Sequence, residues 1–425
     1  MALRIYSLLL WLLTPAYLLR LWWRGRAEPL YRFAMMRRLG FYAQPRPARG
    51  AVWVHAVSLG ETLAATALIS ALRSQRPGMR LLLTHSTATG FAAGTKLLKE
   101  GDAQTWLPFD TPQAVSRFLD HWQPAIGVLM ETEIWPNLMH AAAEKKLPTV
   151  LANARLSERS LRKAQRLNGL MQPAAAHLSL VLAQTEADAA RLREAGASNV
   201  HVSGHLKFDV TPNAALLAQG VAWRGALNRP VLLAAVTREG EEAQLLDAWL
   251  KPLEQSAERP LLVIVPRHPQ RFDEVAALVE ARGLRLARRS AWQATPPADA
   301  LTADVWLGDS VGEMPQYYAL AQAALLGGSF APLGGQNLIE AAACGCPIVM
   351  GPHTFNFAQA AELAEASGAA LRVADMNSGL RAALALMASA QRDVVGQRAL
   401  AFAAQHRGAA ERMEHEISEL MNTLR

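Results

Sequence analysis

The chain has 425 residues, 51% of them hydrophobic and 19% charged, which excludes a disordered or fibrous protein and predicts two domains of ordinary size. Its net charge of +7 comes from 43 Lys and Arg against 36 Asp and Glu. Residues 1–49 hold nine arginines and one glutamate, a charge of +8, so residues 50–425 are at −1. Because a nucleic-acid-binding domain carries its basic stripe on the folded body, we expect no nucleic-acid partner.

An uncharged apolar segment, residues 5–19, precedes most of these arginines. A helix needs about 20 apolar residues to cross a bilayer, so the segment lies near the lower limit. Trp22 and Trp23 follow it, as in interfacial anchors, and an arginine-rich flank stays cytoplasmic and attracts anionic lipids. We therefore predict a membrane-anchor helix with a basic flank (1–49). The alternatives are a signal peptide, which the position of the arginines disfavours, and a buried helix; whether the anchor spans the membrane stays open.

Short β-rich segments then alternate with helical patterns, which is typical of a parallel sheet with helices on both faces. The predicted strands of the first half are 51–56, 79–84, 125–130, 149–154 and 179–184, with a helix at 61–73 after the first. The alternation pauses near Thr211-Pro212-Asn213 and resumes with strands at 231–236, 261–266, 300–308, a segment ending at Gly328, and 347–351. We place a linker near 205–220 and predict two Rossmann-like domains facing a central cleft, where ligands bind beyond the carboxyl ends of the strands.

Polar turns follow the strands of the first half. Ser58-Leu59-Gly60-Glu61 places a carboxylate in the first turn of a helix, where it either complements the helix dipole or acts as a general base. His85-Ser86-Thr87 is a hydroxyl-rich turn suited to a helix cap or a polar ligand. Glu131 and Glu133 are more carboxylates than capping requires, and Arg155 suits an anionic group or a solvated helix start.

The turns of the second half favour an anionic ligand. Arg267 and His268 lie between prolines, a stiff mount for a phosphate or carboxylate contact. The turn 309–314 contains Gly312, whose backbone suits a phosphate. In the glycine-rich segment 327–340, Asn337 and Glu340 share one helix face.

The sequence lacks the motifs that mark several other classes of enzyme. The sequence has no G-x-G-x-x-G, Walker A, H-E-x-x-H or G-x-S-x-G motif, which disfavours nicotinamide cofactors, P-loop ATP use, zinc peptidases and serine hydrolases. The two cysteines, Cys344 and Cys346, are too close in sequence for a framework disulfide, and no second Cys or His pair has zinc spacing. We expect neither a metal nor a cofactor.

Taken together, the motifs resemble the membrane-associated Kdo (3-deoxy-D-manno-octulosonic acid) transferases of Gram-negative lipopolysaccharide biosynthesis, over nearly the whole chain. They read HAVSLGE (55–61), ETEIWPN (131–137), NARLSERS (153–160), GHLKFD (204–209), PRHPQRF (266–272), GDSVGE (308–313) and GGSFAPLGGQNLIEAAACGCPIVMGPHTFNF (327–357). Gln336 departs from the family's usual His, and Ala341 from a frequent Pro, which bears on donor affinity more than on the reaction.

The resemblance implies a GT-B glycosyltransferase that moves Kdo from CMP-Kdo to the lipid A precursor (lipid IVA), with inversion and without a metal, at the cytoplasmic face of the inner membrane. It implies an acceptor domain at 50–210, a CMP-sugar domain at 211–405, and a C-terminal helix at 406–425 that packs on the first domain. Glu61 becomes the candidate base. The candidates for CMP binding are Arg267, His268, Gly312, Glu313, Met314, Asn337 and Glu340. The candidates on the acceptor side are Ser58, Gly60, Ser86, Thr87, Glu131 and Arg155.

Three rival functions stay open at this point. Another membrane-surface GT-B enzyme that uses a UDP-sugar, or a GT-B epimerase, would share the architecture. A membrane-tethered scaffold would keep both domains without catalysis. Nucleic-acid binding is the third, and the near-neutral charge of residues 50–425 weakens it.

Overall fold

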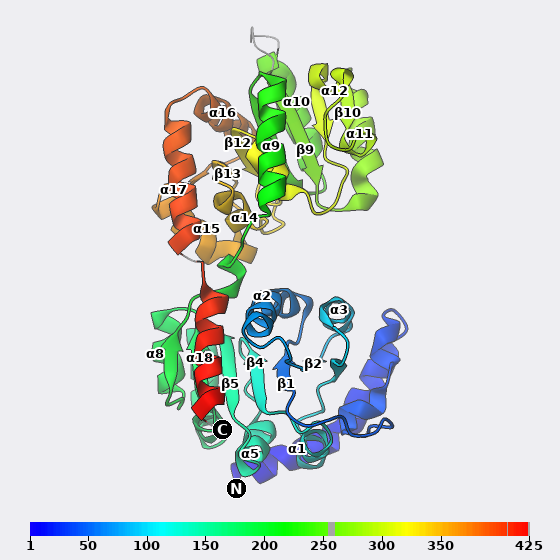
Figure 1. Ribbon diagram of the computed structural model, residues 1–425, viewed down its shortest axis with the longest axis vertical. Helices are drawn as coiled ribbons and strands as arrows, with labels where there is room; N and C mark the ends of the chain where they lie inside the picture. The colour runs from blue at the N-terminus through cyan, green and yellow to red at the C-terminus, as the bar shows by residue number, and fades with distance from the viewer. Residues whose placement is uncertain (254–259, 406, 424–425) are drawn as a thin grey trace. The chain divides into compact units, whose positions relative to one another are not determined.

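The computed structural model describes residues 1–253, 260–405 and 407–423. The chain divides into two compact units: unit 1 is Met1–Asp209 with Gly408–Arg425, and unit 2 is Val210–Arg407. Among the described residues, each unit contains one sheet of seven strands, all paired in parallel (Figure 1). The prediction of two Rossmann-like α/β domains preceded by an apolar helix is confirmed.

The sheet of unit 1 has the strand order β3-β2-β1-β4-β5-β6-β7. Its strands are β1 (Val52–His55), β2 (Leu81–His85), β3 (Ala103–Trp106), β4 (Ile126–Met130), β5 (Thr149–Ala154), β6 (Leu180–Ala183) and β7 (Val200–Val202). Alternate residues of β1 enter different cores: Val52 and Val54 pack with α2 and α18, whereas Trp53 packs with Phe118 and Trp122 on the other face. Both faces of the sheet are therefore buried, as expected for a parallel sheet.

Helices cover both faces of this sheet. The helices of unit 1 are α1 (Ala2–Arg24), α2 (Leu59–Gln75), α3 (Ala88–Gly94), α4 (Pro112–Trp122), α5 (Pro136–Glu144), α6 (Glu158–Arg166), α7 (Asn168–Ala176), α8 (Glu186–Glu194) and α18 (Ala409–Thr423), with 3₁₀ turns η1 (Pro29–Arg32), η2 (Met35–Leu39), η3 (Thr95–Leu97) and η4 (Leu206–Phe208). The C-terminal helix α18 packs beside α2, burying Met413 and Ile417 in the same core. The Asp209 carboxylate accepts hydrogen bonds from the N–H groups of Gly408 and Ala410.

The sheet of unit 2 has the strand order β10-β11-β9-β8-β12-β13-β14. Its strands are β8 (Val231–Thr237), β9 (Leu261–Pro266), β10 (Leu286–Arg288), β11 (Val305–Leu307), β12 (Ala323–Leu326), β13 (Ile348–Met350) and β14 (Ala370–Arg372). Its helices are α9 (Ala214–Leu227), α10 (Glu241–Leu253), α11 (Phe272–Glu280), α12 (Ala298–Thr302), α13 (Met314–Leu320), α14 (Leu338–Ala343), α15 (Ala358–Ala366), α16 (Met376–Met387) and α17 (Gln391–Gln405), with η5 (Pro269–Arg271), η6 (Arg289–Ala291) and η7 (Phe355–Phe357).

Several details of the predicted elements are wrong. Strands β3, β7, β10 and β14 were not predicted, because they lie at or next to the sheet edges, where the segments are short and only partly apolar. The start of the segment 300–308 is the end of α12, and only 305–307 form a strand. The linker near 205–220 is also too long, since α9 begins at Ala214, capped by the Asn213 side chain.

The N-terminal helix α1 contains an 18-residue stretch with a mean hydropathy of 1.5, so by length and composition it could cross a membrane. Leu21 is the one buried residue of α1, whereas Trp11, Trp23 and most of its leucines are exposed. The alternative of a buried N-terminal helix is therefore wrong. Polar contacts nevertheless attach α1 to unit 1: Tyr6 donates to Asp110 at 3.0 Å and Ser7 to Asn137 at 2.9 Å.

Candidate active site

Ser58 and Glu61 are held together at the end of β1. Ser58 is the N-cap of α2, and its Oγ accepts a hydrogen bond from Glu61 N–H at 3.4 Å. The Glu61 carboxylate accepts in return, from Ser58 Oγ–H at 2.9 Å and from Val57 N–H at 2.8 Å. This is close to a capping box, which S-x-x-E spacing favours. The helix-terminus role is thus present, and it also fixes the position of the carboxylate.

The surroundings of Glu61 make its carboxylate more basic. Burial raises the pKa of Glu61, the hydrogen bonds from Val57 and Ser58 lower it, and the neighbouring carboxylates Glu133 and Glu131 raise it again, with a net rise. The space beside Glu61 is open at Gly60, where an added Cβ would meet only Ser58 Oγ, at 3.9 Å. A group with these properties is suited to accept a proton from a hydroxyl placed next to it.

Glu131 and Arg155 form an ion pair at the ends of β4 and β5. Arg155 Nε donates to Glu131 Oε2 at 2.8 Å, and Arg155 Nη2 lies 2.8 Å from the same oxygen. Glu131 has a φ of 59°, in the left-handed region that non-glycine residues rarely adopt, and is buried. The Arg155 guanidinium is therefore already paired with a carboxylate. It is also more than half exposed, so that a second, anionic group can still reach it.

Sequence reasoning did not include Glu133 and His55 among the site residues, although both stand in the quoted motifs. Glu133 Oε2 accepts from Trp135 Nε1 at 2.8 Å and lies 3.8 Å from Nε2 of the buried His55. Because this contact joins the ends of β1 and β4, only the strand order reveals it.

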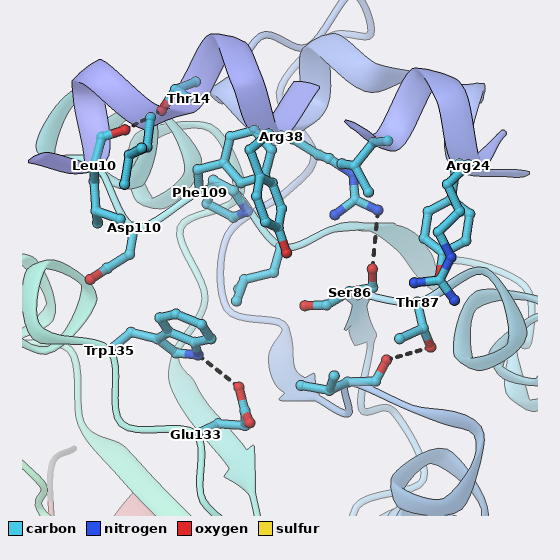
Figure 2. A pocket seen from close by; sticks show the side chains of 17 residues that line it. Leu10, Thr14, Arg24, Arg38, Ser86, Thr87, Phe109, Asp110, Glu133 and Trp135 are labelled. Atoms are coloured by element: carbon cyan, nitrogen blue, oxygen red, sulfur yellow. Dashed lines mark hydrogen bonds between the residues drawn. The ribbon is translucent and has the colours of Figure 1, made fainter. Parts of the chain in front are cut away.

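Ser86, Thr87 and Glu133 line a pocket of about 550 Å³ between α1 and the carboxyl edge of the sheet (Figure 2). Its walls are mostly apolar, and α1 forms one of them with Leu10, Leu13 and Tyr17. Val57, which holds the Glu61 carboxylate, is also part of the lining. The pocket suits a ligand with both apolar and polar parts.

In unit 2, Arg267 and His268 follow β9. Arg267 N–H donates to Thr237 O at 2.9 Å, which fixes the backbone. The Arg267 side chain is exposed and, in the described part of the chain, has no carboxylate partner, so it is available to an anion. His268 is half-buried.

The turn before α13 is organised by Glu313. Its carboxylate accepts from Arg289 Nη2 at 2.8 Å and from Ser310 Oγ–H. Gly312 has a φ of +88°, which favours glycine, and Met314 is half-buried. The Glu313 side chain thus supports the turn, and the prediction that it binds the donor directly gains no support from these contacts.

A buried carboxylate that sequence reasoning missed holds the glycine-rich segment. Glu241 accepts from the N–H groups of Gly328, Phe330 and Arg238 at 2.7, 3.1 and 2.9 Å. Close packing explains Gly327, because a Cβ there would lie 2.2 Å from Val236 O. The signal was available as a charged run, Arg238-Glu239-Gly240-Glu241-Glu242, directly after β8.

Asn337 and Glu340 lie at the start of α14. Asn337 is the N-cap and accepts from Ile339 N–H at 3.1 Å. Burial raises the pKa of the half-buried Glu340 carboxylate, which makes no hydrogen bond or ion pair among the residues described. Ala341 is fully buried, whereas Gln336 is half-buried, with its side chain near Gly328.

Comparison with known proteins gives the family. A model of the 3-deoxy-D-manno-octulosonic-acid transferase (kdotransferase) family matches residues 34–210. The chain is 48% identical to the 3-deoxy-D-manno-octulosonic acid transferase of Bordetella pertussis, over 96% of this chain and 97% of the relative. The chain belongs to the Kdo transferase family. The enzyme of the same description from Haemophilus influenzae is 32% identical over 96% of both chains.

Membership of the Kdo transferase family makes this chain a glycosyltransferase of lipopolysaccharide synthesis. Its architecture is of the GT-B type: the UDP-GlcNAc 2-epimerase of Neisseria meningitidis, 14% identical, has a TM-score of 0.54 over 87% of this chain and 100% of that one, which shows the fold alone. The structure brings Ser58 next to Glu61 and Glu131 next to Arg155. No group of three His, Cys, Asp or Glu residues that could hold a metal is found in the described ranges.

Proposed function

We propose that this Kdo transferase moves Kdo from CMP-Kdo to the lipid A precursor, lipid IVA, with inversion. The observation that carries the proposal is the pairing, in unit 1, of a fixed basic carboxylate, Glu61, with an amphiphilic pocket whose lining includes Val57 and Glu133. A lipid-linked sugar acceptor has the mixed polarity of this pocket.

In the proposed reaction, Glu61 takes the proton of the acceptor hydroxyl as its oxygen bonds to the anomeric carbon of Kdo. The bond between that carbon and the phosphate oxygen breaks, and its electron pair leaves with CMP. One displacement with attack opposite the leaving group inverts the anomeric centre. A positioned base of this kind contributes about 10²–10⁴-fold to the rate.

The proposed donor residues of unit 2 are Arg267 and His268, the backbone at Gly312, and Asn337 with Glu340; Met314 stays a candidate contact. Arg267 supports the proposal because it is exposed and unpaired in the described part of the chain, as a cation that meets a phosphate must be. Glu340 supports it with a carboxylate that accepts no hydrogen bond from the residues that the structure describes and can accept from a sugar hydroxyl.

We propose in addition that α1 anchors the enzyme in the inner membrane with its catalytic units on the cytoplasmic side. The exposed apolar surface of α1 supports this, as does its basic flank: the guanidinium of Arg26 lies 4.8 Å from the Trp23 ring centre and that of Arg32 lies 4.6 Å from the Trp22 ring centre. Such Trp–Arg contacts suit the membrane interface.

The test is incubation of the purified full-length chain with lipid IVA and CMP-Kdo, or with UDP-sugars, followed by assay of the released nucleotide. We expect CMP release that depends on the acceptor. Release from a UDP-sugar instead would support the rival GT-B enzyme, and no release from any donor would support the scaffold.

A further inference from the structure

The pocket under α1 contains a buried arginine with no acidic partner in the described part of the chain. Arg38, in η2, is only 3% exposed. Its Nη2 donates to Ser86 O at 3.2 Å, and its guanidinium lies 4.0 Å from the Trp106 ring centre. Its Nε has no hydrogen-bond partner, and no ion pair forms with a carboxylate in the described ranges. Figure 2 shows the Arg38 side chain reaching into the pocket toward Ser86.

A buried cation whose N–H donors lack acceptors lowers the stability of the fold unless an anion binds to it. Burial lowers the pKa of Arg38 to about 10, so the guanidinium keeps its charge at neutral pH. Among the described residues, the Arg38 side chain makes one hydrogen bond, to the Ser86 carbonyl, which leaves most of its five N–H donors for another group. Guanidinium donors match the oxygens of a phosphate.

The other charged side chains that line the pocket do not supply an anionic partner for Arg38. Asp110 already accepts from Tyr6 and from the N–H groups of Asn137 and Leu138, and Glu133 accepts from Trp135. Arg24, the second cation of the lining, pairs with Glu28 at 3.3 Å and is half exposed.

The apolar walls of the pocket indicate what kind of molecule the anionic group belongs to. Leu10, Leu13 and Tyr17 of α1 face the pocket, and the outer surface of the same helix is the proposed membrane anchor. A ligand that enters here meets apolar side chains continuous with the membrane-facing helix and a positive charge at the buried end.

We propose that Arg38 binds a phosphate group of the acceptor lipid and so orients the acceptor beneath α1. The inference rests on the proposed function for the identity of the acceptor. Arg38 is a binding and positioning residue and takes no part in proton transfer.

The test is direct binding of the full-length protein, in detergent, to phosphorylated lipid A precursor and to the same lipid after phosphatase treatment, without CMP-Kdo. The variants are Arg38→Gln and the matched control Arg37→Gln. Arg37 lies next in the same 3₁₀ turn, bonds to Gln44, and is not part of the pocket lining.

We expect Arg38→Gln to weaken binding of the phosphorylated lipid at least about tenfold, the scale of a lost charge-assisted contact, and Arg37→Gln to change it less than about twofold. Phosphatase treatment should weaken binding by the wild type to a similar degree and leave Arg38→Gln nearly unaffected. Equal losses in both variants, or undiminished phosphate dependence in Arg38→Gln, would overturn the inference.

Two further arms separate the sources of the phosphate. Inorganic phosphate and phosphatidylglycerol micelles should compete weakly; full competition by either would overturn the assignment to the acceptor.

Thermal unfolding of Arg38→Gln and of the wild type checks that the variant is folded. Because the substitution removes an unpaired buried charge, the melting temperature of the variant should be equal to that of the wild type or higher. If Arg38→Gln fails to fold, Thr87→Tyr, which fills the pocket from the other side, must abolish binding instead. The binding assay contains no CMP-Kdo, so its result is independent of the nucleotide-release assay described above. Phosphate-dependent binding here, together with no acceptor-dependent CMP release there, would reject the proposed function and keep this inference.

Discussion

Glu61 accepts a hydrogen bond from the Ser58 hydroxyl at 2.9 Å, while Ser58 caps the helix on which Glu61 stands. The carboxylate is therefore positioned before any substrate binds. Because burial and two nearby carboxylates outweigh its hydrogen bonds, the pKa of Glu61 is nevertheless raised. A fixed and basic carboxylate is what deprotonation of a hydroxyl requires.

Replacing Glu61 by Gln should lower the rate of Kdo transfer by about 10²–10⁴-fold, because the amide cannot take the proton. The fold should persist, since the amide oxygen can still accept one of the two hydrogen bonds. The measurement is single-turnover transfer alongside thermal unfolding. The control is Glu186→Gln, an exposed first-turn carboxylate of α8 in the same unit, which should keep wild-type activity. Equal rates in both variants would remove Glu61 as the base.

The pH dependence of Kdo transfer should depend on the charge of Glu133. The base works only when ionised, so kcat/KM falls as pH drops below the raised pKa of Glu61. A like charge raises that pKa, so Glu133→Gln should lower it and move the acid limb of the profile to lower pH. Measured profiles of the two proteins decide this. A limb that stays in place or moves to higher pH would contradict the assignment.

The glycine-rich segment of unit 2 should depend on Glu241. Glu241→Ala leaves three N–H groups without their acceptor, at about 1–3 kcal/mol for each group that stays buried. We expect a lower melting temperature and weaker CMP binding by calorimetry. Glu239→Ala is the control, since that side chain is exposed and, within the described ranges, forms an ion pair with Arg238 alone. If CMP binds the folded Glu241→Ala variant as tightly as the wild type, the segment does not contribute to the donor site.

Asp110 should make stability depend on pH. Burial raises its pKa to about 7 from 3.8, against hydrogen bonds from Asn137, Leu138 and Tyr6 that lower it. For an acid with a raised pKa in the folded state, the stabilisation is present below the unfolded pKa and is lost as pH rises through the folded value. Melting temperatures measured from about pH 4 to about pH 7 should therefore fall less steeply for Asp110→Asn than for the wild type. Parallel curves would contradict this.

The strands that carry the site were predictable because parallel strands buried on both faces are continuous or nearly continuous apolar segments, as at 126–130 and 180–183. The edge strands were not, because a segment such as Leu286–Arg288 is half exposed and has no such pattern. The apolar N-terminal helix was predicted from its uncharged apolar segment and the two α/β domains from the alternation of strands and helices, while the family and the GT-B type were recognised from motifs.

The contacts of the site depended on the strand order, which the sequence does not contain. Glu61, Glu131 and Ser86 follow separate strands, and their place at a common sheet edge could be inferred from the parallel topology. The contact of His55 with Glu133 could not, since it requires β1 to lie beside β4. Arg38 was counted only as part of the basic flank, because its burial against Trp106 becomes visible only in three dimensions.

The most direct test of the proposed reaction is the mass of the lipid product formed from purified lipid IVA and CMP-Kdo by the full-length enzyme and by its Glu61→Gln variant. The wild type should yield the acceptor with its mass increased by one or more Kdo residues, and the variant should return the acceptor unchanged over the same time. An acceptor of unchanged mass with the wild-type enzyme, or equal product with the variant, would contradict the account.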